Sequence, residues 1–240
     1  MAEFKETRWA DREFSKLYRD AADIYMPFRQ RFIEVTKSLY SFFFDNQTNV
    51  RVLDLGCGDG FFIEELLKIH TPESITLVDG SADMLNAAKK RMNGRADVEY
   101  IQASFQDIIN TQILKGQYDF IYSSFAIHHL VYSEKERLYF KLYNHLNPGG
   151  CFIHNDVIAP SSGRIEKWYL TLWREWIEEF PDREKSAGME IIPEKYKESP
   201  DDFPDPLDTH LELLKKARFI DVDCFFKYGI FALFGGFKAE

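Results

Sequence analysis

A glycine-rich turn between an apolar strand and a helix constrains this chain more than any other feature. The stretch Val52–Gly60 reads Val-Leu-Asp-Leu-Gly-Cys-Gly-Asp-Gly, and an apolar segment with helical character begins at Phe61. Glycine permits a sharp turn and lets a ligand approach the main chain closely. The first turn of a helix leaves unpaired N–H groups beside such a loop. The sequence therefore predicts a strand–loop–helix cradle for a small molecule.

The charge of this loop narrows the choice of ligand. A phosphate-binding loop would end in Gly-Lys-Ser/Thr, and no lysine is present. A dinucleotide fingerprint needs glycine at its sixth position, which is Phe61 here. The loop instead carries Asp54 and Asp59, which would repel a pyrophosphate and suit a cation. S-adenosylmethionine, with a sulfonium and an ammonium and no phosphate, meets this requirement.

The stretch Val52–Gly60 resembles the first motif of the class I S-adenosylmethionine-dependent methyltransferases. The segment Ala126–Leu130 and the Leu-Asn-Pro-Gly-Gly turn at 146–150 resemble the same family, in its small-molecule branch. The resemblance covers roughly 49–157 and 209–238. It implies an α/β fold, a Rossmann-like seven-stranded sheet that is mostly parallel, with a C-terminal antiparallel hairpin and helices on both faces.

The resemblance also implies a set of cofactor contacts. The predicted strand Ser74–Asp79 ends in an acid about twenty residues after the glycine loop, where a carboxylate can accept hydrogen bonds from ribose hydroxyls. Ser104 stands where many relatives have an aspartate that holds the adenine amino group, so its hydroxyl or the Phe105 N–H would take that role, with Asp107 as a rival. The expected cofactor-binding residues are Asp54, Gly56, Gly58, Asp79, Gly80, Met84, Ser104, Phe105 and Ser123.

The remaining chain is expected to form a single methyltransferase domain of four parts. These are an N-terminal helical extension (1–47), the cofactor-binding core (48–158), a helical cap insert (159–207), and a final helix with a hairpin (208–240). In the extension, helices are predicted over Glu6–Tyr25 and from Pro27 onward, the second with an apolar stripe of Phe28, Phe32, Val35, Leu39 and Phe42. Ser133 and Glu136 predict a capping box, and Ser161–Ser162 predict a cap for the insert helix.

The acceptor side is less constrained by the sequence. His128 and His129 follow the fourth predicted strand and are candidate catalytic bases, or else hold their loop in place. Asp156 alone is weak evidence for a metal ligand, so no metal site is expected, and the acidic tract Pro200–Pro206 is interpreted as a solvated loop. The candidate substrate residues are Tyr25, Arg29, Asp156, Trp168 and Trp173, with Tyr18 beside them. The aromatic residues expected to wall an acceptor pocket are Tyr25, Phe28, Trp168, Trp173, Tyr228 and Phe231.

Composition limits the partners. The formal net charge of -9 disfavours a large nucleic-acid footprint, and the chain lacks the Asn/Asp-Pro-Pro-Tyr/Phe signature of enzymes that methylate exocyclic base amines. Three cysteines without metal-ligand spacing predict reduced thiols in a cytoplasmic protein. The densely charged N-terminus predicts no signal peptide, and no apolar run approaches a membrane span. The oligomeric state stays open.

The leading hypothesis is in-line methyl transfer from S-adenosylmethionine to a small, apolar or aromatic acceptor. The alternatives are another S-adenosylmethionine-using enzyme of a carboxymethyl-forming or lyase-like kind, a binding protein that holds the cofactor without turnover, and a tRNA or protein methyltransferase. The product formed from the cofactor distinguishes these readings.

Overall fold

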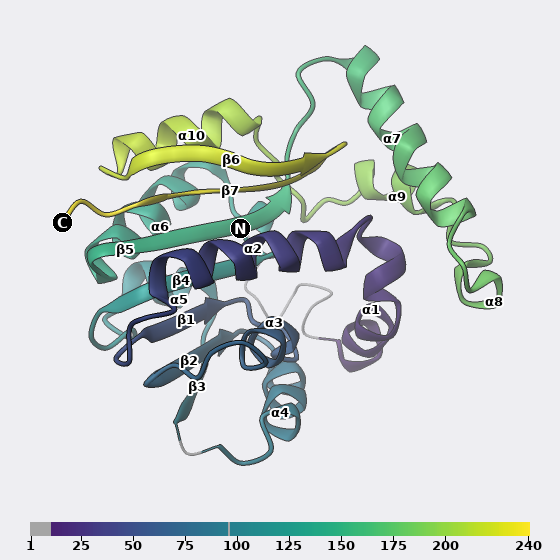
Figure 1. The fold of residues 1–240 in the computed structure, drawn as a ribbon. Coiled ribbons are helices and arrows are strands. Elements are labelled where there is room, and N and C mark those ends of the chain that lie inside the picture. The colour runs from purple at the N-terminus through teal and green to yellow at the C-terminus, as the bar shows by residue number, and fades with distance from the viewer. Residues whose placement is uncertain (1–10, 96) are drawn as a thin grey trace.

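A seven-stranded sheet forms the centre of the molecule (Figure 1). The computed structural model describes residues 11–95 and 97–240, so the part of the predicted first helix before residue 11 lies outside the described residues, as does the side chain of Tyr18. The strand order is β3-β2-β1-β4-β5-β7-β6. The strands are β1 (Arg51–Leu55), β2 (Ser74–Asp79), β3 (Val98–Gln102), β4 (Tyr118–Ser124), β5 (Leu146–Val157), β6 (Ile220–Tyr228) and β7 (Phe231–Phe237).

The first five strands are parallel, and β7 pairs antiparallel with both β5 and β6. This arrangement confirms the predicted fold class, including the closing hairpin. The central strands are apolar on both faces because helices cover both, as is usual for parallel sheets. Phe120, Ile121 and Tyr122 of β4, for example, are all buried.

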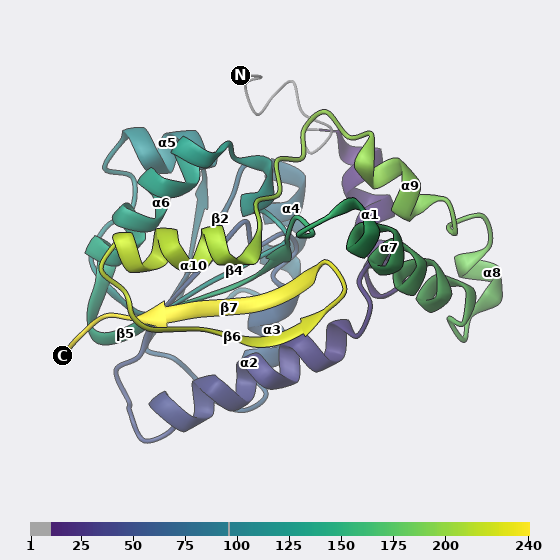
Figure 2. The same ribbon diagram turned by 90° about the horizontal axis from the view of Figure 1, so that it is seen from above.

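Two hydrophobic cores lie on opposite faces of the sheet (Figure 2). One contains side chains of α2, α3, α4 and α7, and the other contains side chains of α5, α6 and α10. The helices are α1 (Arg12–Tyr25), α2 (Arg29–Phe44), α3 (Phe61–Leu66), α4 (Ala82–Arg91), α5 (Phe105–Asn110), α6 (Tyr132–His145), α7 (Gly163–Glu178), α8 (Arg183–Ser186), α9 (Ile192–Lys197) and α10 (Leu207–Lys216), with a short 3₁₀ helix η3 (Ile127–His129).

The apolar stripe expected on α2 is wrong at Phe42, which faces solvent. Phe42 is 82% exposed, whereas the buried side chains of this helix are Phe32, Ile33, Thr36, Tyr40 and Phe44. The helix begins two residues after Pro27, with Phe28 in a left-handed conformation at its N-cap. Aromatic residues at positions 40 and 42 to 44 leave several apolar faces open to choice, and packing against the sheet selects one of them.

The predicted capping box at Ser133 is also wrong. The helix α6 begins two residues earlier than this cap implies, at Tyr132, and the Glu134 side chain accepts a hydrogen bond from the Val131 N–H. Ser133 therefore lies within the first turn. The cap on α7 is confirmed, since Ser162 Oγ accepts from the Ile165 N–H.

Helices α1 and α7–α9 gather at one end of the molecule, beyond the carboxyl ends of the parallel strands (Figure 1). The Trp173 indole N–H donates to the Tyr25 carbonyl oxygen at 2.9 Å and so joins α7 to the end of α1. Among the described residues, no helix has the length and apolar character needed to cross a membrane.

Candidate functional site

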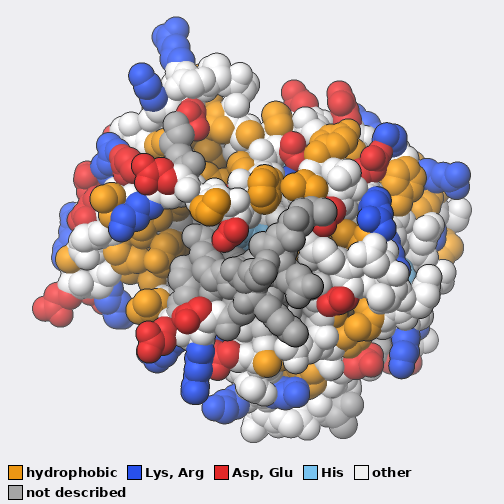
Figure 3. Space-filling model, turned by 180° about the vertical axis from the view of Figure 1, so that it is seen from behind, with side chains coloured by type: hydrophobic (Ala, Val, Ile, Leu, Met, Phe, Trp, Pro, Cys, Tyr) orange, Lys and Arg blue, Asp and Glu red, His pale blue; other side chains and the backbone are white. Residues whose placement is uncertain are grey.

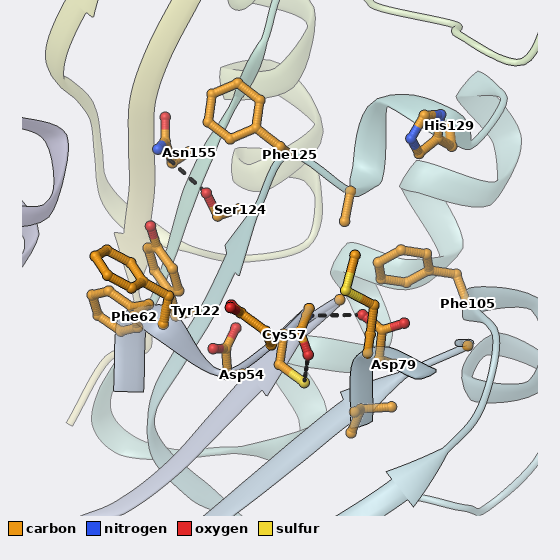
Figure 4. A pocket seen from close by; sticks show the side chains of 18 of the residues that line it. Asp54, Cys57, Phe62, Asp79, Phe105, Tyr122, Ser124, Phe125, His129 and Asn155 are labelled. Atoms are coloured by element: carbon orange, nitrogen blue, oxygen red, sulfur yellow. Dashed lines mark hydrogen bonds between the residues drawn. The ribbon is translucent and has the colours of Figure 1, made fainter. Parts of the chain in front are cut away.

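A cavity of about 490 Å³ opens at the carboxyl ends of β1, β2 and β4. Figure 4 shows Asp54 and Asp79 on one side of it, with Asn155, Phe125 and His129 on the other. From β1 the chain continues to β2 and β3 on one side, and it then returns to form β4 on the other side of β1. Ligands of open α/β sheets bind where the strand order reverses in this way. The cavity is therefore where the fold itself predicts a small-molecule site.

The glycine loop takes its shape from three left-handed backbone positions, of which Gly56 is the most constrained. A Cβ atom added at Gly56 would lie 2.5 Å from the Cβ of Ala126. The N–H groups of Gly56 and Cys57 both donate to the Val78 carbonyl, at 2.8 and 3.0 Å, and hold the loop against β2. Only glycine meets both the steric and the backbone requirement at this position.

Asp79 links the loop to the start of α4. Its two carboxylate oxygens accept hydrogen bonds from the Gly58 N–H at 2.9 Å and the Ser81 N–H at 2.8 Å. Burial raises the pKa of Asp79 to about 6, although these two backbone donors oppose the increase. The carboxylate is thus fixed in orientation and retains lone pairs for a ligand hydroxyl.

A second buried carboxylate lies nearby. Burial, together with Asp79 and Asp59, raises the pKa of Asp54 well above its ordinary value. Asp59 is balanced by Arg91, with 2.5 Å between Oδ2 and Nη2. Buried carboxylates whose ionisation is unfavourable would be stabilised by a cationic ligand. The carboxylates at this end of the cavity therefore suit a ligand that carries positive charge.

The sides of this half of the cavity are apolar. Met84 is buried, and its sulfur lies 4.0 Å from where a Gly58 Cβ would stand. Phe105 approaches the same loop, with its ring 3.5 Å from the corresponding position at Gly56. Ser104 caps α5, and its hydroxyl and N–H both donate to Asp107, which accounts for both residues structurally.

Eight of the nine expected cofactor residues line the cavity. They are Asp54, Gly56, Gly58, Asp79, Gly80, Met84, Ser104 and Phe105. Ser123 does not, because it points to the opposite face of β4 and donates to the Leu55 carbonyl at 2.8 Å. Its neighbours Tyr122 and Ser124 face the cavity instead, so the expectation for Ser123 is corrected by one position along the strand.

The two histidines after β4 have different surroundings. His129 lines the cavity, and its Nδ1 lies 2.9 Å from Asp202 Oδ1. Burial lowers the pKa of His129 and neighbouring His128 adds to this, against the effect of Asp202, so the ring is neutral at pH 7. His128 is not a cavity residue: its Nδ1 lies 2.5 Å from Asp156, and its backbone N–H donates to the same carboxylate at 2.9 Å.

Asp156 is buried behind the cavity wall, contrary to the expectation that it contacts the substrate. It bridges His128 and His154, whose Nε2 lies 2.8 Å from Oδ2. Burial alone would raise the pKa of Asp156, but these two histidines hold it well below its ordinary range. The residue therefore orients His128.

The aromatic residues expected to wall the acceptor pocket lie outside it. Trp168 is 54% exposed, and Trp173 is buried against Phe231 with ring centroids 5.1 Å apart. Phe28 packs on Trp176 and Tyr228, at centroid distances of 4.7 and 4.8 Å. Tyr25 is not among the cavity-lining residues and provides its carbonyl to Trp173. This expectation is corrected because the aromatic residues form the packing between α2, α7 and the hairpin.

Arg29 is the candidate substrate residue that does line the cavity. Its guanidinium lies 3.9 Å from the Phe61 ring centroid and 2.8 Å from Asp23. Sequence reasoning missed Phe62, Tyr122, Ser124 and Asp202. Asn155 is fully buried in the cavity wall, and its Oδ1 has no hydrogen-bond partner among the described residues. Its position directly before Asp156 was visible, but the direction of its side chain was not.

The expected solvated loop at 200–206 is corrected as well. The Asp202 side chain is only 3% exposed, and the Phe203 N–H donates to the His128 carbonyl at 2.8 Å. Asp205 accepts from the buried Lys135 at 2.7 Å. The loop therefore completes the wall of the cavity around η3.

Comparison with known proteins shows which families the chain resembles. Residues 52–150 match the methyltransferase domain family. A carboxy-S-adenosyl-L-methionine synthase of Nautilia profundicola is 21% identical over 95% of this chain and 93% of its own length.

Solved structures share the fold. An O-methyltransferase family protein from Burkholderia thailandensis has a TM-score of 0.67 at 15% identity, with 98% of this chain covered. The chain spans 63% of that protein's length. Magnesium protoporphyrin IX methyltransferase from Synechocystis PCC 6803, solved with bound SAH, has a TM-score of 0.62 at 12% identity, with 96% of both chains covered. Residues 52–150 therefore form a methyltransferase domain, and the chain shares the fold of class I S-adenosylmethionine-dependent methyltransferases.

Proposed function

We propose that this protein transfers a methyl group from S-adenosylmethionine to a small-molecule acceptor bound in the same cavity. The observation that carries the proposal is the composition of that cavity. Buried carboxylates and a glycine loop form one end. A neutral histidine forms the other, together with a buried amide oxygen that has no hydrogen-bond partner among the described residues. The first end suits the cofactor, and the second suits an acceptor with a polar reacting atom.

The cofactor would be held by residues of β1, β2 and the loops after them. Asp79 would accept hydrogen bonds from the ribose hydroxyls, since two backbone donors already fix its orientation. Met84 and Phe105 would pack on the adenine, and the Ser104 region would border its edge. Asp54 lies where it would balance the positive charge of the cofactor.

Arg29 is suited to bind a negatively charged group of a ligand. It is a cavity-lining cation beside Phe61, the residue that follows the glycine loop. A guanidinium is suited to bidentate pairing with a carboxylate. We propose that Arg29 pairs with a carboxylate at this end of the cavity, supplied either by the amino-acid part of the cofactor or by the acceptor.

The reaction itself makes limited demands on the protein. The methyl group of the cofactor is bonded to a positively charged sulfur. When the methyl group is transferred, the neutral thioether that remains is a good leaving group. The protein must align the acceptor atom and exclude water, and it must deal with any proton that the acceptor loses. His129 and Asn155 are the polar groups placed to contact an acceptor, and the buried His128–Asp156 pair supports the loop from behind.

A carboxymethyl-forming activity on the same cofactor is the second candidate. It is supported by the carboxy-S-adenosyl-L-methionine synthase similarity, which extends over 95% of this chain. In that case the cofactor itself would be changed.

A nucleic-acid acceptor has less support, because Lys and Arg side chains on the face in Figure 3 are scattered among Asp and Glu and form no single basic field. The free cysteines Cys57, Cys151 and Cys224 are consistent with a cytoplasmic location.

Incubation with methyl-labelled S-adenosylmethionine and a small-molecule metabolite extract tests the proposal. We expect S-adenosylhomocysteine to appear together with a small molecule that carries the label. The Asp79→Asn variant should lose most of this activity, while Asp208→Asn, on an exposed position of α10, should keep it. A modified cofactor without S-adenosylhomocysteine would favour the second candidate, and tight cofactor binding without either product would indicate a binding protein.

A further inference from the structure

Three potential metal ligands converge next to the cavity, and of these three His129 lines it. His128 and His129 belong to η3, and Asp202 belongs to the loop before α10. One carboxylate oxygen of Asp202, Oδ1, lies 2.9 Å from His129 Nδ1 and 3.6 Å from His128 Nε2. One ligand atom from each of the three side chains lies within 4.8 Å of the other two.

We propose that His128, His129 and Asp202 bind a divalent first-row transition metal ion such as Zn²⁺. Zinc bonds to imidazole nitrogen and carboxylate oxygen are about 2.0–2.2 Å long, so tetrahedral ligand atoms stand roughly 3.4 Å apart. The two measured separations bracket that value. Two imidazoles and one carboxylate favour zinc, iron, cobalt or nickel over magnesium or calcium, which prefer oxygen ligands alone.

The surroundings of His128 match those of a metal-binding histidine. A histidine ligand usually donates its second ring N–H to a carboxylate, which fixes its orientation. Here Asp156 takes that position, 2.5 Å from His128 Nδ1. With the proton on Nδ1, the Nε2 atom presents a lone pair toward the Asp202 carboxylate, which also has only lone pairs to offer. A cation between them would make both contacts favourable.

The loop that carries Asp202 is anchored from both sides. The Phe203 N–H donates to the His128 carbonyl at 2.8 Å, and buried Lys135 donates to the Phe203 carbonyl and to Asp205. The side chains of His128 and Asp202 are 8% and 3% exposed. In contrast to a chance cluster on the surface, this site is buried, and its loop is fixed by independent hydrogen bonds.

The site faces the cavity on one side only. His129, Asp201 and Phe203 line the cavity, whereas His128 and Asp156 lie behind it. Three protein ligands that leave a fourth position open are the arrangement of catalytic rather than structural zinc sites, and His129 is the ligand that borders the cavity. The inference rests on the proposed function in one respect, namely that the acceptor would supply an oxygen or nitrogen lone pair to the ion. Without the ion, His129 Nδ1 donates to the Asp201 carbonyl at 3.1 Å; to bind the ion through Nδ1, the ring would give up this hydrogen bond and carry its proton on Nε2.

Metal binding can be measured without reference to activity. The full chain, without a histidine tag, would be stripped with a chelator and titrated with Zn²⁺ by calorimetry and with Co²⁺ by visible absorption. We expect one ion per chain and the d–d absorption of Co²⁺ with mixed nitrogen and oxygen ligands. Asp202→Asn and His128→Ala should abolish saturable binding, and Asp156→Asn should weaken it by about 10–100-fold. Asp208→Asn, at an exposed position, and His145→Ala, at a half-buried position outside the cavity, should bind as the wild type does.

The possible outcomes separate this inference from the methyl transfer on which it rests. Equal binding by wild type and folded Asp202→Asn, or no binding by wild type, would overturn the metal site. If methyl transfer then persists in chelator, the proposed function stands and the His129–Asp202 pair acts through its hydrogen bond alone. If one ion binds and no methyl group is transferred, the metal site stands and the proposed function fails. Thermal melting of each variant would show whether a loss of binding reflects unfolding.

Discussion

At the level of single residues, Asp79 couples the shape of the glycine loop to its charge. Two backbone N–H groups fix the carboxylate, while burial raises its pKa to about 6. The ionised form is the one that would accept hydrogen bonds from ribose hydroxyls. Protonation of Asp79 should therefore compete with cofactor binding.

The affinity for S-adenosylmethionine should fall as the pH drops below about 6, by up to tenfold per pH unit. Asp79 has the opposite effect on folding. Because its pKa is raised in the folded state, the folded protein binds more protons than the unfolded chain between pH 3.8 and about 6. The contribution of Asp79 to the free energy of unfolding therefore decreases as the pH rises through this range. Calorimetric titration from pH 5 to 8 measures the affinity. Asp79→Asn should bind about 10–100-fold more weakly and show a flatter pH profile. A wild-type affinity that stays constant over this range would contradict the assignment.

Gly56 provides a second test at the residue scale, with Gly94 as a matched control. Both have left-handed backbones, with φ of 65° and 73°, but an added Cβ meets Ala126 at 2.5 Å in the first case and nothing within 4 Å in the second. Gly94→Ala should cost about 1–2 kcal/mol of unfolding free energy and leave cofactor affinity unchanged. Gly56→Ala should cost more and lose cofactor binding. Denaturant titration and calorimetry measure both; equal effects of the two variants would show that the close approach at Gly56 is unimportant.

At the level of elements, a partly buried hydrogen bond joins α7 to the end of α1. The Trp173 indole donates to the Tyr25 carbonyl at 2.9 Å, and its ring packs on Phe231. Trp168, on the same helix, is 54% exposed. The two tryptophans look equivalent in sequence, and only tertiary packing distinguishes them.

Trp173→Phe should lower the free energy of unfolding by about 1–3 kcal/mol, because it removes the hydrogen bond and leaves unfilled volume. Trp168→Phe should change it by no more than about 0.5 kcal/mol. Urea denaturation of both variants provides the comparison. A larger loss at Trp168 than at Trp173 would contradict the packing described for α7.

Some bounds of the helices and strands could be predicted from the sequence, and others could not. The strand Ser74–Asp79 was predicted to the residue because an apolar run ends in a functional acid. The start of α6 was missed because Ser133 and Val131 offer competing caps, and local hydrogen bonds decide between them. Ser123 was chosen in place of Ser124 since a strand alternates faces, and the sequence does not say which face meets the cavity.

At the level of the whole molecule, the missed residues are those brought together by long-range contacts. Asp202 meets His129 across more than seventy positions of sequence, and nothing local to Pro200–Pro206 distinguishes a buried loop from a solvated one. The glycine loop and Asp79 were found because a single βαβ unit positions both. The acceptor side depends on loops from several parts of the chain, and for that reason it could not be predicted.

A buried network behind the cavity should govern acid stability. The Tyr139 hydroxyl contacts His154 and, at 2.8 Å, His210, whose pKa is lowered to about 3 by burial. Between pH 6.5 and 3 the unfolded chain binds a proton at His210 that the folded protein does not. This residue's contribution to stability is therefore complete above pH 6.5 and is lost by about 1.4 kcal/mol per pH unit below it.

His210→Gln should consequently lose less unfolding free energy than wild type between pH 7 and 5. The difference between the two proteins, measured by denaturant titration at each pH, isolates His210 from the opposing effect of Asp79. Identical slopes for His210→Gln and wild type would mean that His210 takes up its proton in the folded state.

The proposed function requires the cofactor to occupy this cavity in one orientation. The most direct test is a crystal structure of the protein grown with S-adenosylhomocysteine. The ribose oxygens should lie within hydrogen-bond distance of the Asp79 carboxylate, with the adenine between Met84 and Phe105 and the sulfur directed toward Asn155 and His129. A ligand bound outside the cavity, or one that leaves Asp79 without a ribose contact, would contradict the account.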